Sequence, residues 1–110
     1  MTVQDAARTV RITKGRTTVE TTTRYEIEGA GPVGRGSKGT KIYPQTMTVT
    51  LSDDGDGHVR IFQLGGVSLT GPVVRKNGTT SKRVTSLTWV YDMPDWVKDF
   101  VYEETGIRLP

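Results

Sequence analysis

The sequence contains no cysteine and only one histidine, His58. Disulfide bonds and thiolate metal sites are therefore excluded, and the fold must be stabilised by packing. A catalytic arrangement that uses histidine would have to be built around His58, which follows Asp56 in a polar, glycine-containing turn. The serines do not lie in the sequence context of a nucleophile elbow. We therefore expect a protein that is not an enzyme, with no catalytic residue, metal or cofactor.

Long hydrophobic runs are also missing. Hydrophobic residues make up 34% of the 110 residues, and no stretch approaches the roughly 20 apolar residues that cross a bilayer. The first eight residues lack the apolar segment of a signal peptide. These features predict a cytoplasmic protein without membrane contacts, and they are compatible with a component of an assembled particle. A chain of this length can build one core, so we expect a single domain over residues 1–110.

The residues between 17 and 28 indicate the fold class. Successive side chains of a strand point to opposite faces, and here small or apolar residues alternate with charged ones. A strand with one wet face is typical of an antiparallel sheet, because parallel strands are usually covered on both faces. One predicted face carries Val19, Thr21, Thr23, Tyr25 and Ile27, and the other carries Glu20, Thr22, Arg24, Glu26 and Glu28.

Similar patterns predict further strands and hairpins. Strands are expected over residues 8–13, 46–51, 59–64 and 67–75, followed by a hairpin to a last strand. A three-residue loop, Lys76–Gly78 with Gly78 in the left-handed region, keeps the apolar residues of this hairpin together. That face would then carry Val67, Leu69, Val73, Leu87, Trp89 and Tyr91.

One helix is predicted near the C-terminus. Asp92 can cap it, Pro94 suits its first turn, and Gly106 can end it. At 100° per residue, one stripe contains Met93, Trp96, Val97, Phe100 and Ile107. The predicted fold is therefore α+β and mainly β: a single antiparallel sheet of about six strands, or a small barrel, with one amphipathic helix packed on it.

Three apparent ligand motifs do not fit this fold. Residues 29–34 spell G-x-G-x-x-G, but neither a buried strand nor a helix start surrounds them. Within residues 31–41, the order of lysine and hydroxyl residues is the reverse of that in a phosphate-binding loop. Residues 54–65 lack the glycine and the bidentate acid of an EF-hand calcium loop. We expect a glycine-rich surface loop at 29–39 and a polar turn at 52–57.

The charged residues are unevenly distributed. Residues 71–90 contain four basic residues and no acid, whereas residues 91–110 contain five acids and two bases. A basic region of this kind can neutralise the phosphates of a nucleic acid. The candidate contacts lie on the loop at 31–41 and the hairpin at 75–83, and they are Arg35, Lys38, Lys41, Arg75, Lys76, Lys82 and Arg83.

Protein contacts provide the other functional hypothesis. The predicted helix places Glu103 and Glu104 in its last turn, where the helix dipole disfavours anions. A basic group of this chain or of a partner could compensate, and Tyr102 adds an aromatic ring on the same polar side. A small sheet also has edges that can pair with another chain. We therefore expect an interaction or assembly module that binds a protein partner or itself, with sequence-nonspecific nucleic-acid binding as the alternative.

Overall fold

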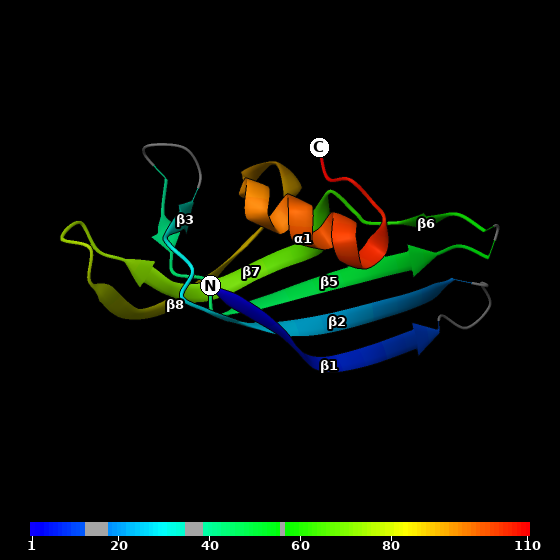
Figure 1. Ribbon diagram of the computed structural model, residues 1–110, viewed down its shortest axis with the longest axis horizontal. Coiled ribbons are helices and arrows are strands. Elements are labelled where there is room, and N and C mark those ends of the chain that lie inside the picture. The colour runs from blue at the N-terminus through cyan, green and yellow to red at the C-terminus, as the bar shows by residue number, and fades with distance from the viewer. Residues whose placement is uncertain (13–17, 35–38, 56) are drawn as a thin grey trace.

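A computed structural model describes residues 1–12, 18–34, 39–55 and 57–110 (Figure 1). Five long strands are β1 (Thr2–Ile12), β2 (Val19–Glu28), β5 (Thr46–Asp53), β7 (Leu64–Val74) and β8 (Thr80–Trp89). Three strands of two residues are β3 (Val33–Gly34), β4 (Lys41–Ile42) and β6 (Val59–Arg60). A 3-10 turn, η1 (Val90–Asp92), leads into the helix α1 (Asp95–Thr105).

The strands form one open antiparallel sheet, which confirms the predicted mainly β, α+β class. The main path is β1-β2-β5-β7-β4-β3, with β8 paired to β7 and β6 paired to β5. In the described part of the chain this sheet has eight strands, more than the six expected, because three of them are short strands of two residues. The sheet does not close, so the barrel alternative is wrong.

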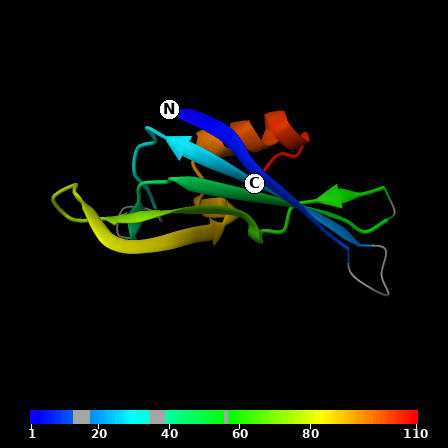
Figure 2. The same ribbon diagram turned by 90° about the horizontal axis from the view of Figure 1, so that it is seen from below.

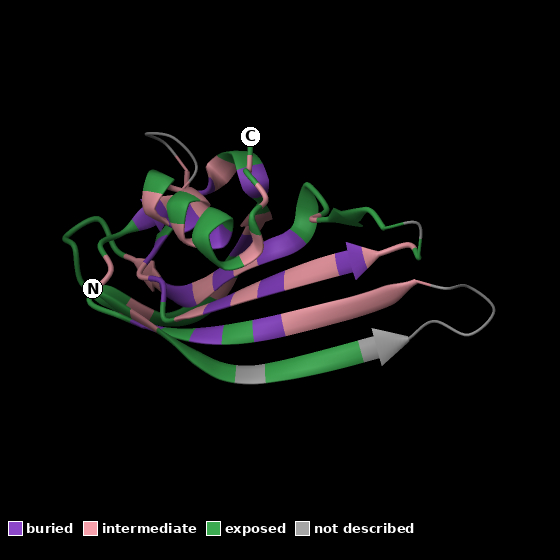
Figure 3. Cartoon of the chain, turned by 45° about the vertical axis from the view of Figure 1, so that its right-hand side comes forward, coloured by how far each residue is buried: buried purple, intermediate pink, exposed green. Residues whose placement is uncertain are grey.

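The core lies between one face of the sheet and the helix (Figure 2). The alternation predicted for residues 17–28 holds in β2, where Thr23, Tyr25 and Ile27 are buried and the charged residues between them are exposed. Buried residues recur along the neighbouring strands in the same way (Figure 3). They include Met47, Val49, Val67, Leu69 and Leu87, and α1 contributes Val97 and Val101.

Threonine and serine hydroxyls cover the opposite face of the sheet. The Oγ1 atoms of Thr22 and Thr50 are 2.9 Å apart across β2 and β5. The hydroxyl oxygens of Thr70 and Ser86 are 2.6 Å apart across β7 and β8. Cross-strand hydroxyl pairs of this kind stabilise a sheet whose face stays in water, so the high threonine content follows from the one-sided core.

The helix packs through the predicted stripe but begins later than predicted. Asp92 lies in η1, Pro94 occupies the N-cap position, and no side chain caps the helix. Gly106 ends the helix in the left-handed conformation, as the sequence indicated. Trp96 and Phe100 are partly buried against the core. No helix in the described ranges is long and apolar enough to cross a membrane.

The β7–β8 hairpin confirms the predicted loop and most of the predicted face, since Val67 and Leu69 are buried and Val73 packs against the core. The amide of Arg75 donates to the carbonyl of Thr79 at 2.8 Å, and Gly78 has φ of +85°, as a three-residue loop requires. Leu87 is buried, whereas Trp89 and Tyr91 are exposed. The face prediction is wrong for these two residues. Trp89 lies beyond a register shift between Leu64 and Leu69, and Tyr91 lies in η1, where the strand alternation has ended.

The strand predicted over residues 59–64 is also shorter than expected. Only Val59 and Arg60 pair with β5, after which the chain turns into β7. At Gly66, a Cβ atom would lie 2.4 Å from the carbonyl oxygen of Phe62. This close backbone approach explains why glycine occupies the bend, and the bend leaves Phe62 and Leu64 on the surface.

Candidate binding surfaces

A groove brings together the two basic segments that the sequence analysis selected. Its volume is about 460 Å³, and Lys41, Arg75 and Lys76 lie along it. Ile42 of β4 pairs with Val73 of β7, which holds the loop and the hairpin side by side. We name these residues the basic groove; its other lining residues are Pro32, Gly39, Thr40, Tyr43, Val73, Val74 and Gly78.

Tyr43 fixes one wall of the basic groove. Its hydroxyl donates a hydrogen bond to the carbonyl oxygen of Gly78 at 2.9 Å, which ties the loop side to the hairpin turn. The cationic side chains are solvent-exposed, and no ion pair joins Lys41, Arg75 or Lys76 to an acid in the described residues. The groove therefore presents positive charge that an anion can approach.

The remaining predicted anion contacts are distributed differently. Lys82 and Arg83 are exposed on β8 and do not line the groove. Arg35 and Lys38 fall outside the described residues. Three of the seven candidates are thus brought to one cavity by the fold.

A second surface consists of exposed apolar residues at the other end of β7 and β8. Leu64 and Trp89 are directly opposite each other across the two strands. The rings of Trp89 and Tyr91 have centroids 5.2 Å apart, and the Gln63 amide is 3.4 Å from the Tyr91 hydroxyl. We name the apolar members the aromatic patch, with exposed fractions of 45% for Phe62, 63% for Leu64, 36% for Trp89 and 52% for Tyr91.

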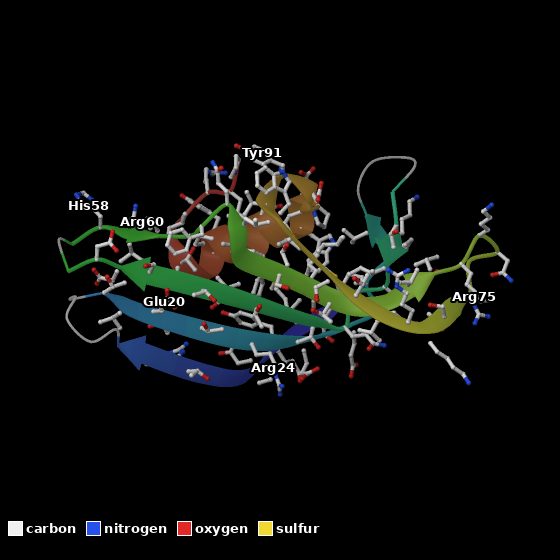
Figure 4. The ribbon with its side chains drawn as sticks, turned by 180° about the vertical axis from the view of Figure 1, so that it is seen from behind. Glu20, Arg24, His58, Arg60, Arg75 and Tyr91 are labelled. Carbon is white, nitrogen blue, oxygen red and sulfur yellow. The ribbon has the colours of Figure 1, made fainter. Side chains whose placement is uncertain are left out.

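Arg60 extends the aromatic patch on one side. Its guanidinium carbon lies 5.8 Å from the centroid of the Phe62 ring, and the same side chain forms an ion pair with Asp54. Figure 4 shows Tyr91 near the top centre of the molecule, with Arg60 towards one end and Arg75 at the other end, by the hairpin. The basic groove and the aromatic patch are therefore separate surfaces.

Sequence reasoning missed the aromatic patch. It assigned Trp89 and Tyr91 to the core because period-two alternation continues from Leu87. The available signal was the pair Gly65–Gly66, which indicates a bend or bulge and therefore a possible change of face. Leu64, immediately before that pair, is the member with the largest exposed fraction.

The predicted partner contacts on the helix are all exposed. The Arg108 guanidinium carbon lies 4.1 Å from the centroid of the Tyr102 ring, which places a cation of this chain beside the last helical turn. No ion pair to Glu103 or Glu104 occurs among the described residues.

Burial raises the pKa of the Tyr25 hydroxyl, and the negative charges of Glu104 and Asp5 raise it further.

The polar turn that resembles a calcium loop uses its carboxylates within the chain. The amide of Gly55 donates to Oδ1 of Asp53 at 2.9 Å, and Asp54 pairs with Arg60. No cluster of three or more potential metal ligands occurs in the part of the chain that the structure describes. His58 is exposed beside this turn.

Comparison with known protein families, with curated proteins and with solved structures finds no match for this chain. Two surfaces of the protein are therefore the basis for a functional proposal. One is a groove lined by cationic residues, and the other is an apolar, aromatic patch.

Proposed function

We propose that the protein is a non-enzymatic interaction module that binds a protein partner through the aromatic patch. The observation that carries the proposal is that Leu64, Trp89 and Tyr91 adjoin one another on the surface, with exposed Phe62 two residues before Leu64. Single exposed apolar residues are ordinary, but a contiguous apolar patch is typical of an interaction site.

The composition of the patch supports a protein partner. Tryptophan, tyrosine and arginine are the residue types that dominate the binding energy of protein interfaces. Here Trp89 and Tyr91 are held by strand pairing and ring packing, and Arg60 lies at the rim. Rings that are already ordered lose little side-chain entropy on binding. The patch is therefore prepared for an apolar partner surface.

The test replaces Leu64 and Tyr91 by serine in the full chain. Both side chains are largely exposed, so the free energy of unfolding should change by less than about 0.5 kcal/mol for each. Proteins captured from the native host by the wild-type chain should be identified, purified and measured for direct binding. We expect binding to weaken by roughly 30-fold or more, because central aromatic anchors contribute about 2 kcal/mol or more each.

The matched control is Val84→Ser. Val84 is an exposed apolar residue of β8, 60% accessible, that is not part of the aromatic patch. It should leave the affinity for the same purified partner unchanged. Equal binding by the wild type and the Leu64→Ser/Tyr91→Ser variant would refute a role for the patch.

The basic groove supports a second candidate function, electrostatic binding of nucleic acid. Lys41, Arg75 and Lys76 converge on one cavity although they come from distant parts of the chain. Three phosphate contacts predict a log–log dependence of affinity on salt with a slope of about −2.7 for duplex DNA, and about −2.1 for single strands. Tyr43 is engaged with the turn, so stacking adds little specificity.

A salt titration against mixed-sequence DNA and RNA tests this second candidate. Replacing Lys41, Arg75 and Lys76 by serine should remove most of the slope, because binding would then release fewer counterions from the nucleic acid. Lys98→Ser on the helix is the control, since Lys98 is a cation that does not line the groove. Binding with the same slope in the triple variant would exclude the groove as the contact.

A further inference from the structure

The outer edge of β1 is open along its length. Within the described residues β1 pairs only with β2, and it forms one margin of the sheet. The opposite margin, β8, carries adjacent cations at Lys82 and Arg83, and such like charges discourage pairing of two copies along that edge. The charges of β1 are of both signs, so its edge lacks this protection.

A bulge in β1 determines which of its side chains point to the core face of the sheet. Asp5 is opposite Tyr25 and Arg8 is opposite Thr23, and the register shifts at the residue after Asp5. In a regular strand residues three apart point to opposite faces. The extra residue of the bulge instead brings Asp5 and Arg8 to the same face of the sheet. Val3 and Val10, opposite Ile27 and Thr21, share that face.

This order is self-complementary. Read along the core face, β1 presents Val3, Asp5, Arg8 and Val10, so the reversed strand presents an apolar residue, a cation, an anion and an apolar residue. We propose that β1 pairs antiparallel with β1 of a second copy of this chain, about a two-fold axis through the bulge. Asp5 then faces Arg8 of the second copy, and Val3 faces Val10 of the second copy. Each pair occurs twice because the interface is isologous.

In the single chain, one member of the apolar pair is left exposed to water. Val10 is 57% exposed although it shares the core face. Val3, at the other end of the strand, packs against the core cluster. In the paired sheet Val10 of the second copy lies beside Val3, which extends the apolar layer and removes Val10 from water. Opposite charges directly across an antiparallel pair add to the same register.

The inference rests on the proposed role in protein contacts but uses a different surface. β1 and β8 lie on opposite margins of the sheet, so pairing at β1 leaves the aromatic patch accessible. Loss of self-association by a β1 variant with partner binding retained, or the reverse, separates the two proposals.

The experiment measures the mass of the full chain by light scattering over a concentration series, with a monomer of 12.1 kDa. We expect the wild type to dimerise with a dissociation constant on the order of micromolar, as for a small interface. Asp5→Arg places two arginines opposite each other, and Arg8→Asp places two aspartates opposite each other. Each single variant should dimerise roughly 30-fold more weakly, since two pairs become repulsive.

Two rescue measurements distinguish this register from general damage. The double variant Asp5→Arg/Arg8→Asp restores opposite charges and should dimerise like the wild type. An equimolar mixture of the two single variants should form a heterodimer, since each then meets its complement. Asp99→Arg and Lys98→Asp make equal charge changes elsewhere and should leave the dimer intact. A wild type that stays monomeric, or a dimer that none of these β1 changes weakens, would overturn the proposal.

Discussion

Removal of the Phe100 ring tests how the helix is attached to the sheet. The Phe100 ring meets the Tyr25 ring edge-on, with centroids 4.9 Å apart and planes at 87°. A fully buried phenylalanine loses about 3–5 kcal/mol on truncation to alanine. Phe100 is only partly buried, so the area term is smaller, and the aromatic pair contributes about 0.5–1.5 kcal/mol of the total. We expect Phe100→Ala to lower the free energy of unfolding by about 2–3 kcal/mol.

Urea unfolding monitored by circular dichroism gives the measurement. The midpoint should fall with the m-value unchanged, because the surface exposed on unfolding hardly alters. Tyr102→Ala removes a ring from the exposed side of the same helix and should cost less than about 1 kcal/mol. If the two variants lost equal stability, the attachment of α1 through Phe100 would be refuted.

Three further predictions concern Tyr25 and the glycines. Glu104→Gln should lower the pKa of Tyr25 towards its ordinary value of 10.0, because it removes a nearby negative charge. Subtracting the ultraviolet titration curve of Glu104→Gln/Tyr25→Phe from that of Glu104→Gln gives the titration of Tyr25 alone, which is compared with the same difference in the wild-type background. The raised pKa also means that the folded state holds the phenolic proton more tightly, so Tyr25 contributes stability below pH 10 that is lost above it; Tyr25→Phe should flatten that alkaline loss in unfolding curves. Gly71→Ala should destabilise by about 2 kcal/mol or more, because a Cβ atom there would lie 1.8 Å from the Tyr43 carbonyl oxygen, whereas Gly31→Ala has no atom within 4 Å and should be near neutral in thermal unfolding.

The elements that depend on local pattern were predictable from the sequence. β2 follows its period-two alternation because every second residue, such as Tyr25 and Ile27, packs in the core that α1 helps to form. Gly106 ends α1 and Gly78 closes the hairpin because each needs a positive φ. These features are written in adjacent residues, so neither requires knowledge of what lies across the sheet.

The exposed positions of Trp89 and Tyr91 were not predictable in the same way. For Trp89 the exposure depends on the register shift between Leu64 and Leu69 of β7, and for Tyr91 on the end of β8 at Trp89, after which the chain enters η1. Alternation alone cannot reveal such a shift, because one extra residue reverses every side chain beyond it. The helix start was misplaced for a related reason, since η1 occupies the residues around Asp92 that were assigned to the cap.

The basic groove was predictable only in part, because it is formed by two segments that are far apart in the sequence. The sequence identified Lys41, Arg75 and Lys76 as basic residues on two segments, but not that these segments meet. Their meeting depends on one pairing between residues far apart, Ile42 and Val73. Such long-range contacts are decided by the whole sheet. The sequence can therefore predict which residues are candidate anion contacts, but only the fold shows that they lie around one cavity.

The bulge in β1 bears on the proposed association of two copies of this chain. Bulges commonly discourage edge pairing by twisting a strand away from a would-be neighbour. In β1 the same irregularity has a second effect, because it aligns Asp5 and Arg8 on one face. An edge that only needed protection would be served by like charges, as on β8 with Lys82 and Arg83. Opposite charges in a palindromic order favour association of two copies, and only of two, because the pairing uses up the β1 margin of both.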